Sequence, residues 1–593
     1  MKRRPELFDM VAVTVPTEAQ DVQVGDVGTV VELLPPDGVE VEFLTTDGRT
    51  RHVGSFPVHD VLTLNHVRNE AAVDADRIGG AALKWARKHI LSFGDTDLLP
   101  GSFEYRALTG PVWQETYRHL CETDLASHIP RPLQRYLVPK PMGGFRVAHR
   151  LDPIDAILYS AAAYEISSTI ESSRVGVGRR VACSYRVVAT DDGHLFARDS
   201  GWNDYWERSV DLAKRHAFAL ETDIADFYGS VSHEGLGHAL CEAGVPERRV
   251  ASLRRFLGAE SLGAAEGLPV GPTASHLLAE ACLTRVDRML LEKGYAFSRY
   301  VDDYRVSVDD RGAAVSAELA LTEYLRQAYG LAIRDSKTTV RGTTELLGRR
   351  LVHPEREADE ERERSVQRFI TDLRDEGYGA DATDLANDHA GQTICRDLVE
   401  LVGEAIDSEP IRFGTIRHAL RRARFLRTSA LQTVVLENLR LLSPVLRDVC
   451  NYISATIPGN EGQARSVGDR LIDYATTSDY KDCPYVQLWT LHTLCECPAA
   501  STYETVASLA EKAEDGLGVR PRALAATAFG QPDWLREHKA AAMDFGPWDR
   551  RALIWAGQAL PPKERRGWLG HLIEQANDPL DRAVAHHVLS IPA

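Results

Sequence analysis

The stretch FSRYVDDYRVSV, residues 297–308, places two strand-like arms on either side of the adjacent carboxylates Asp302 and Asp303. In the second arm apolar and polar residues alternate, which is the two-residue period of a half-buried strand. Aspartate favours turns because its side chain can bond the nearby backbone, so we predict a tight hairpin with both carboxylates at its tip. Adjacent like charges repel and carboxylate oxygens suit Mg²⁺, so such a tip favours a bound cation. Taken alone, the stretch is equally compatible with an acidic turn in solvent. The next acidic pair, Asp309-Asp310, precedes a predicted helix and is better explained as its N-cap.

A second acidic strand is predicted upstream, in HAFALETDIADFYGSV at residues 216–231. Its apolar residues alternate so that Glu221 and Asp223 share the opposite face. Because an unpaired carboxylate at the end of a buried strand is costly, a cation shared with the downstream hairpin would explain Asp223. Between the two strands, GLPVGPTASHLLAEACL at residues 267–283 predicts a rigid Gly/Pro loop followed by an amphipathic helix.

The order of these motifs resembles that of the reverse transcriptases, and the resemblance covers roughly residues 100–352. Asp223, followed by Phe227 and Tyr228, resembles their first palm motif. Leu268-Pro269-Val270-Gly271 resembles the second, usually written LPQG, with Val270 in place of the common Gln. Tyr300-Val301-Asp302-Asp303 matches the YxDD box. The resemblance implies a right-hand fingers–palm domain whose palm is of the ferredoxin-like βαββαβ type.

The resemblance also implies phosphoryl transfer with two divalent metal ions, Mg²⁺ or alternatively Mn²⁺. We expect the metals to be held by Asp223, Asp302, Asp303 and the backbone carbonyl of Ile224. Lys337, in LAIRDSKTTVRG, resembles the lysine of the fourth palm motif, which protonates the leaving pyrophosphate. With the three aspartates it completes the expected catalytic set; an exposed strand lysine is the alternative interpretation.

The expected nucleotide-binding residues come from three further places. Lys140 and Arg146 flank the Gly143-Gly144 turn, so a hairpin can bring both cations onto one face. In reverse transcriptases the matching pair contacts the triphosphate of the incoming nucleotide. Tyr228 lies where that family carries an aromatic gate against the ribose 2′-OH, which favours deoxynucleotides. Gly271 closes the second palm motif and completes the set.

At 593 residues the chain is too long for one core, and its fold class is predicted as multidomain α+β. Residues 1–66 are predicted to form a small SH3-like β-barrel and resemble small bacterial domains with the pattern LFD…GDVGTVVE. We predict a helical connector at 67–95, fingers and palm at 96–352, and a charged linker at 353–365. Residues 366–593 carry apolar residues at helical spacing and are predicted to form an all-α, HEAT-like array.

Charge and cysteine content limit the classes of function. The formal net charge is −17, so any nucleic acid must bind in a local basic groove rather than by bulk attraction. The nine cysteines are scattered and suggest no disulfide framework, which fits a reducing cytoplasm. We find neither a signal peptide nor an apolar run of about 18 residues, so we expect no membrane partner.

The closest resemblance is to the defence-associated (unknown group) reverse transcriptases of the abortive-infection class, which carry a similar SYR segment and C-terminal helical repeats. It implies antiphage defence and protein-primed, untemplated DNA synthesis from dNTPs, with a DNA product attached covalently to the chain. Tyr105 or Tyr117 is the candidate priming residue, because either could reach the palm if its segment were flexible. A template-copying enzyme with an RNA partner is one alternative, and a helical sensor or scaffold that triggers the polymerase is another. We also expect a homo-oligomer.

Overall fold

The computed structural model describes residues 5, 10–16, 22–45, 50–63, 75–109, 112–141, 143–197, 201–259, 266–351, 389–457 and 460–592. The chain divides into two compact units, Met1–Ala75 and Asp76–Ala593. The predicted charged linker, 353–365, lies outside the described residues. No described helix combines the length and the apolar character that crossing a bilayer requires.

The N-terminal unit is a five-stranded antiparallel sheet in the order β4-β3-β2-β1-β5. Its core consists of alternating strand residues such as Val39, Val41 and Phe43, all 0% exposed. Between the described residues no pairing joins the edge strands β4 and β5, so the sheet is confirmed while the SH3-like barrel stays a prediction. The strands are β1 (Met10–Val13), β2 (Val27–Leu34), β3 (Gly38–Leu44), β4 (Thr50–Pro57) and β5 (Val61–Thr63), with the 3₁₀ helix η1 (Val58–Asp60) before β5.

The larger unit begins with helices that pack around α4, which is buried on nearly all sides. Asp152 starts α4 by accepting a hydrogen bond from the Ile154 N–H at 3.1 Å, and Pro153 fits its first turn. Helix α1 packs on α4, so this part of the predicted connector shares one core with the predicted fingers and palm. The elements here are α1 (Gly80–Phe93), α2 (Glu104–Ala107), α3 (Trp113–Glu122), the hairpin β6 (Gln134–Pro139) and β7 (Phe145–Arg150), α4 (Pro153–Ser173), η3 (Val177–Arg179) and α5 (Gly201–Ala213).

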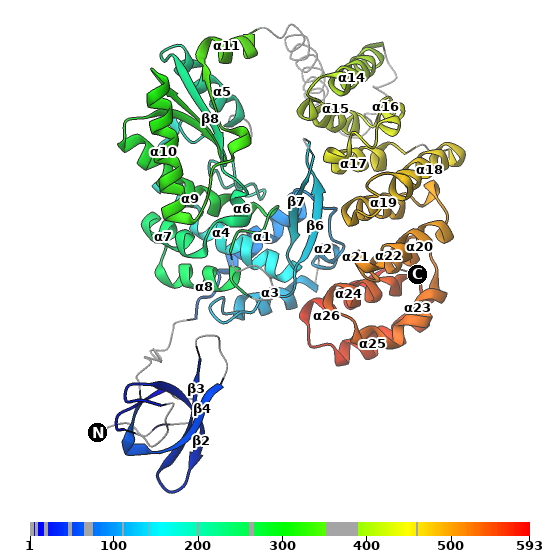
Figure 1. Cartoon of the computed structure of the whole chain (residues 1–593). Coiled ribbons are helices and arrows are strands. Elements are labelled where there is room, and N and C mark those ends of the chain that lie inside the picture. Colours follow the sequence, from blue (N-terminus) through cyan, green and yellow to red (C-terminus); the bar gives the residue numbers. More distant parts are fainter. Residues whose placement is uncertain are drawn as a thin grey trace. The chain divides into compact units, whose positions relative to one another are not determined.

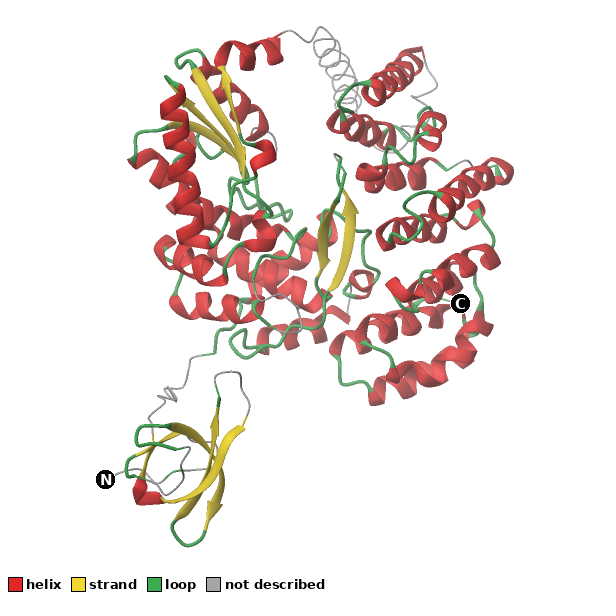
Figure 2. Ribbon diagram, viewed as in Figure 1, coloured by secondary structure: helices red, strands yellow, loops and turns green. Residues whose placement is uncertain are grey.

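A four-stranded antiparallel sheet in the order β11-β8-β10-β9 follows, and Figure 2 shows it near the top of this unit. Its connectivity is β-α-β-β-α-β, which confirms the predicted palm topology. Asp310 caps α10 by accepting from the Ala313 N–H at 2.8 Å, as predicted. The elements are β8 (Phe218–Asp223), α6 (Phe227–Ser230), α7 (His233–Ala243), α8 (Glu247–Leu257), α9 (Thr273–Glu292), β9 (Ala296–Tyr300), β10 (Asp303–Val308), α10 (Arg311–Tyr329), η5 (Asp335–Lys337), β11 (Thr339–Gly342) and α11 (Thr343–Leu351).

The C-terminal region is helical wherever it is described (Figure 1). Helices α15, α17, α19, α22, α24 and α26 each pack on the one before, which gives a stack; its HEAT-like identity stays a prediction. The helices are α14 (His389–Asp407), α15 (Phe413–Phe425), α16 (Gln432–Glu437), η6 (Ser443–Val445), α17 (Leu446–Thr456), α18 (Glu461–Thr477), α19 (Pro484–Glu496), η7 (Pro498–Ala500), α20 (Tyr503–Lys512), α21 (Glu514–Leu517), α22 (Arg520–Ala528), α23 (Pro532–His538), η8 (Lys539–Asp544), α24 (Pro547–Ala556), η9 (Gly557–Ala559), α25 (Pro562–Gln575) and α26 (Pro579–Ser590).

Buried ion pairs join this helical array to the predicted fingers region. Arg520 donates to Glu104 at 2.7 Å, and Arg551 donates to Asp152 at 2.7 Å. Burial alone would raise the pKa of Glu104, but Arg520 and Arg551 outweigh it and lower that pKa to about 2. Because removing one partner of a buried pair is costly, these contacts hold the two regions together as one compact unit.

Candidate active site

The strand register brings the three predicted aspartates to one edge of the palm sheet. Asp303 lies directly opposite Asp223 on β8 and opposite Tyr300 on β9. Directly opposed residues of an antiparallel pair project from the same face, so Asp223 and Asp303 are neighbours. The hairpin is confirmed with one difference: Val301 and Asp302 form the turn, whereas Asp303 is already the first residue of β10.

The turn at the hairpin tip is held in a conformation that its sequence does not favour. Val301 has φ of +53°, an uncommon value for a β-branched residue. Its N–H donates to Ser184 Oγ at 2.9 Å, and its carbonyl accepts from Arg299 Nη1 at 3.0 Å. Arg299 is itself fully buried between Glu280 and Asp287. A buried hydrogen-bond network of Ser184, Arg299, Glu280 and Asp287 therefore holds the turn at the hairpin tip. Ser184 is the first residue of the SYR segment.

Burial and the negative charges of neighbouring carboxyl groups raise the pKa values of Asp302 and Asp303. Burial, and then the charges of Asp223 and Asp303, raises the pKa of Asp302 to about 7. Burial and the Asp223 charge likewise raise the pKa of Asp303, although Lys337 and other cations oppose the shift. Three ionised carboxylates at this edge therefore need added positive charge.

Two cations already contact Asp223. Lys337 Nζ and Arg334 Nη1 both meet Asp223 Oδ2, the latter at 3.1 Å. Sequence reasoning missed Arg334, although its place three residues before Lys337 could have suggested it. The predicted proton transfer from Lys337 to pyrophosphate stays a prediction.

The donor chemistry of the site fits a divalent metal, although its side chains are not assembled around one. Among the described residues, no group of three or more Asp, Glu, His or Cys side chains is positioned to hold a metal. Asp223 Oδ1, however, is buried without a hydrogen-bond partner in the described part of the chain. The Ile224 N–H donates to the Asp302 carbonyl at 3.3 Å, so Ile224 also lies at this edge. Binding would require the cations on Asp223 to shift.

Tyr228 lies close to this edge, on α6. Its hydroxyl shares a hydrogen bond of 2.8 Å with His276 Nδ1, and the His276 ring stacks on Tyr185 at 4.3 Å. Burial, followed by the charges of Tyr185 and Asp302, raises the pKa of Tyr228 well above its ordinary value. The ring is therefore a fixed, neutral wall near Asp302. Sequence reasoning missed both His276 and Tyr185, which lie in other segments.

Gly271 is required by the backbone. Its φ is +120°, and a Cβ there would clash with Thr96 Oγ1. The loop docks on β7 because the His149 N–H donates to the Val270 carbonyl at 2.9 Å and the Val270 N–H donates to His149 Nδ1 at 3.0 Å. Since Val270 docks through its backbone, its replacement of Gln does not disturb the loop.

The hairpin β6–β7 carries Arg146 on its array side and Lys140 at its turn. Arg146 is opposite Val138, whose face packs with the helical array. Arg146 also adds to the positive field at Arg417 of α15. The Lys140 N–H donates to the Gly144 carbonyl at 3.0 Å and closes the turn. The triphosphate role of Lys140 and Arg146 stays a prediction.

Both candidate priming tyrosines lie in helices, and the priming role of either stays a prediction. Tyr105 is in α2, is 7% exposed, and donates to Asp95 Oδ2 at 3.2 Å. Burial raises its pKa well above the ordinary value. Tyr117 is in α3, where it is half-buried; its ring packs against the core around α4, with Lys84 Nζ over the ring.

Comparison with known proteins identifies the polymerase region. Residues 138–351 match the family described as reverse transcriptase (RNA-dependent DNA polymerase), and residues 7–62 match a domain of unknown function (DUF4926). No curated protein matches the chain. The first match indicates that the chain is an enzyme, an RNA-directed DNA polymerase and hence a nucleotidyltransferase.

Solved telomerase structures show a distant similarity. Telomerase from Candida albicans in complex with a fragment of telomeric RNA is 12% identical, with a TM-score of 0.28, and covers 62% of this chain and 67% of its own. Apo telomerase from Candida tropicalis is 9% identical, with a TM-score of 0.29, and covers 61% and 68%.

Proposed function

We propose that the chain polymerises dNTPs into DNA with Mg²⁺ or Mn²⁺ held by Asp223, Asp302, Asp303 and the Ile224 carbonyl. The observation that carries this proposal is the register that sets Asp303 opposite Asp223, beside the Asp302 turn. A divalent cation bound there activates the attacking hydroxyl and stabilises the leaving pyrophosphate. Reverse transcriptases as a family use divalent metal ions, which agrees with the acidic edge.

The other site residues have complementary roles in this proposal. Lys337 and Arg334 supply positive charge beside the reacting phosphates, and Lys337 gives a proton to pyrophosphate. Tyr228 excludes a ribose 2′-OH, and the Gly271 loop borders the nucleotide. Lys140 and Arg146 meet the triphosphate after the fingers hairpin moves from its present position against the array.

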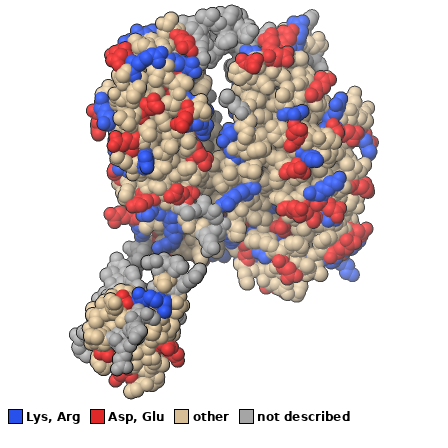
Figure 3. Space-filling model, viewed as in Figure 1, with Lys and Arg blue, Asp and Glu red and all other residues tan. Residues whose placement is uncertain are grey.

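A basic cluster beside the fingers hairpin supports a nucleic-acid partner. Arg417 is surrounded by the charges of Arg146, Arg421 and Arg447, with Asp448 as the acidic partner of Arg417 and Arg421. Figure 3 shows Lys and Arg side chains along the hollow between the palm and the helical array. A local excess of positive charge can hold a phosphate backbone although the whole chain carries −17.

We extend the proposal to antiphage defence, on the resemblance to the abortive-infection class. In this view synthesis is protein-primed and untemplated, the C-terminal stack is a HEAT-like scaffold for the product, and the enzyme acts as a cytoplasmic homo-oligomer. Copying of an RNA template is the alternative mechanism for the same site, and a sensor role of the stack is compatible with both.

The priming mode is tested with purified protein, Mg²⁺ and dNTPs in the absence of primer and template. We expect a DNA adduct on the protein that survives boiling in detergent and that nuclease removes, because a tyrosine hydroxyl can attack a triphosphate. One Tyr→Phe change should prevent the adduct, and Tyr117→Phe is the first to test since Tyr105 is buried. Extension of an annealed primer on RNA by adduct-free protein would favour template copying.

The gate is tested by Tyr228→Ala. We expect this variant to incorporate ribonucleotides more readily, by a factor that corresponds to a few kcal/mol of lost steric discrimination. The measurement is the ratio of rNTP to dNTP incorporation. Tyr228→Phe is the matched control, because it keeps the ring and loses only the hydrogen bond to His276. An unchanged ratio in an active Tyr228→Ala variant would place the gate elsewhere.

A further inference from the structure

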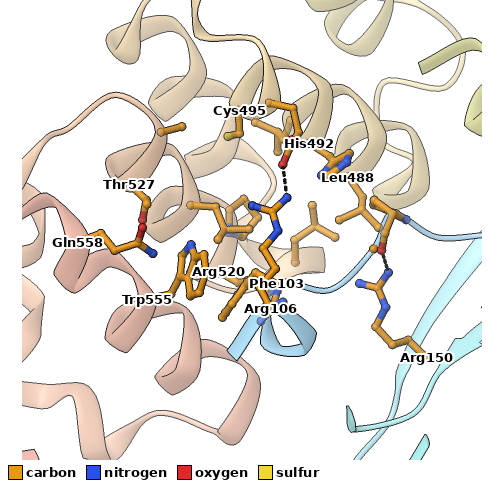
Figure 4. Close-up of a pocket in the computed structure, with 18 of the residues that line it drawn as sticks. Phe103, Arg106, Arg150, Leu488, His492, Cys495, Arg520, Thr527, Trp555 and Gln558 are labelled. Atoms are coloured by element: carbon orange, nitrogen blue, oxygen red, sulfur yellow. Dashed lines mark hydrogen bonds and ion pairs between the residues drawn. The ribbon is translucent and has the colours of Figure 1, made fainter. Parts of the chain in front are cut away.

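A cavity of about 210 Å³ lies between the polymerase region and the helical array, away from the acidic edge. Phe103 and Tyr136 line it from the polymerase side, and Leu488, Leu524 and Trp555 line it from the array (Figure 4). These walls are mostly apolar and aromatic, which is typical of sites for small organic molecules. The volume is below the roughly 300–1,000 Å³ of drug-sized sites, so it suits one or two fused rings rather than a whole nucleotide.

Two buried nitrogens on the lining lack hydrogen bonds. Gln558 Nε2 and Arg150 Nε are both without a partner in the described part of the chain. Asp95 lies near Arg150 Nε, but at 3.7 Å, which is beyond hydrogen-bond distance. A buried donor without an acceptor costs folding free energy, so an acceptor on a bound molecule would stabilise both nitrogens.

Arg106 supplies a cation that a ligand can recruit. Its partner on the lining is Glu496 at 3.2 Å, and both side chains are largely open to solvent, at 63% and 44% exposed. Figure 4 shows the Arg106 side chain extending along the cavity to this ion pair. Exposed pairs contribute little, so a carboxylate in the cavity can replace Glu496 at low cost. The neighbouring His492 is neutral near pH 7, because burial lowers its pKa to about 4.

We propose that this cavity binds a small aromatic carboxylic acid. Its rings lie against Phe103, Leu524 and Trp555, and its carboxylate meets Arg106 and the free donor of Gln558. The acid is an effector rather than a substrate, since none of the proposed metal-binding or nucleotide-binding residues lines the cavity.

The backbone connects this cavity to the nucleotide site. Arg150 lines the cavity and donates to the Pro100 carbonyl, while the preceding His149 makes both hydrogen bonds to Val270. Because Arg150 belongs to the lining, a molecule that fills the cavity borders the strand on which the Gly271 loop docks. We infer that occupancy alters the KM for dNTP, an effect that rests on the proposed polymerase function.

The test measures binding of indole-3-acetate and of its uncharged analogue indole-3-ethanol to the full chain by calorimetry. We expect saturable binding of the acid, with the alcohol about tenfold weaker because it lacks the charge-assisted bond. Arg106→Gln should remove this preference, and Gln558→Met should lower the affinity for the acid. Leu524→Trp should fill the cavity and abolish binding of both compounds. Arg465→Gln is the matched control, because Arg465 forms a similar exposed pair with Glu461 at 3.0 Å on helix α18, which contributes no residue to the lining of this cavity.

The outcomes separate the parts of the proposal. The site is overturned if neither compound binds saturably. It is also overturned if Arg106→Gln and Leu524→Trp both bind the compounds with unchanged affinity. Equal affinities of acid and alcohol overturn the carboxylate assignment. Binding is measured without turnover, so an inactive polymerase leaves this result intact. An unchanged KM for dNTP in an active enzyme saturated with the acid overturns the link to the nucleotide loop.

Discussion

Asp302→Ala is expected to abolish dNTP incorporation and any defence phenotype, with a rate loss on the order of 10³-fold or more. Such a loss corresponds to about 4 kcal/mol of transition-state stabilisation, which is the scale of a lost metal ligand. We expect this large loss of rate because Asp302 lies in the turn beside Asp223 and Asp303, which are directly opposite each other. The measurement is incorporation of labelled dNTP by the full chain at saturating Mg²⁺.

Asp309→Ala is the matched control. Asp309 belongs to the second acidic pair, its side chain is 78% exposed, and it pairs with His216 at 2.9 Å at the far end of β10. We expect this variant to keep most of its activity. Equal losses in Asp302→Ala and Asp309→Ala would contradict the metal assignment.

The second large effect is expected at Glu280, beneath the hairpin. Glu280 is 0% exposed and accepts from Arg174 at 2.6 Å, from Arg299 at 2.9 Å and from Ser184 at 2.5 Å. In Glu280→Ala the guanidinium groups of Arg174 and Arg299 stay buried but lose a negative partner, so the palm should lose about 3–5 kcal/mol of stability. Because Ser184 and Arg299 also hold the Val301 turn, activity should fall as well.

Local stability is best measured by hydrogen exchange, because a chain of several regions need not unfold in one step. We expect faster exchange in peptides covering 297–308 in Glu280→Ala than in the wild type. Glu207→Ala serves as the control, since it removes a pair with Arg180 in which both side chains are exposed, at 60% and 42%. Unchanged exchange at the hairpin would mean that the network does not support the turn.

Sequence reasoning succeeded where the pattern is local. Alternation along residues 216–231 and 297–308 predicted both strands, the turn and the face of Asp223, because these depend on neighbours in the chain. The palm topology, in contrast, was predicted from the resemblance of the motifs to those of reverse transcriptases.

The unpredicted features depend on segments far apart in the sequence. His276 meets Tyr228 across 48 residues, and Arg520 meets Glu104 across 416. No periodicity encodes such pairs, so the wall behind Tyr228 and the docking of the array were missed. The burial of Tyr105 was missed for the same reason, since Asp95, which accepts from its hydroxyl, is brought there by tertiary packing.

The central claim is that Asp223, Asp302 and Asp303 hold a divalent metal, and Mn²⁺ binding tests it without primer, template or trigger. The measurement is the Mn²⁺ bound per full chain, followed by electron paramagnetic resonance with dATP present. We predict that wild type and Asp309→Asn bind Mn²⁺ alike, whereas Asp302→Asn binds markedly less. Equal Mn²⁺ binding by wild type and Asp302→Asn would contradict the claim.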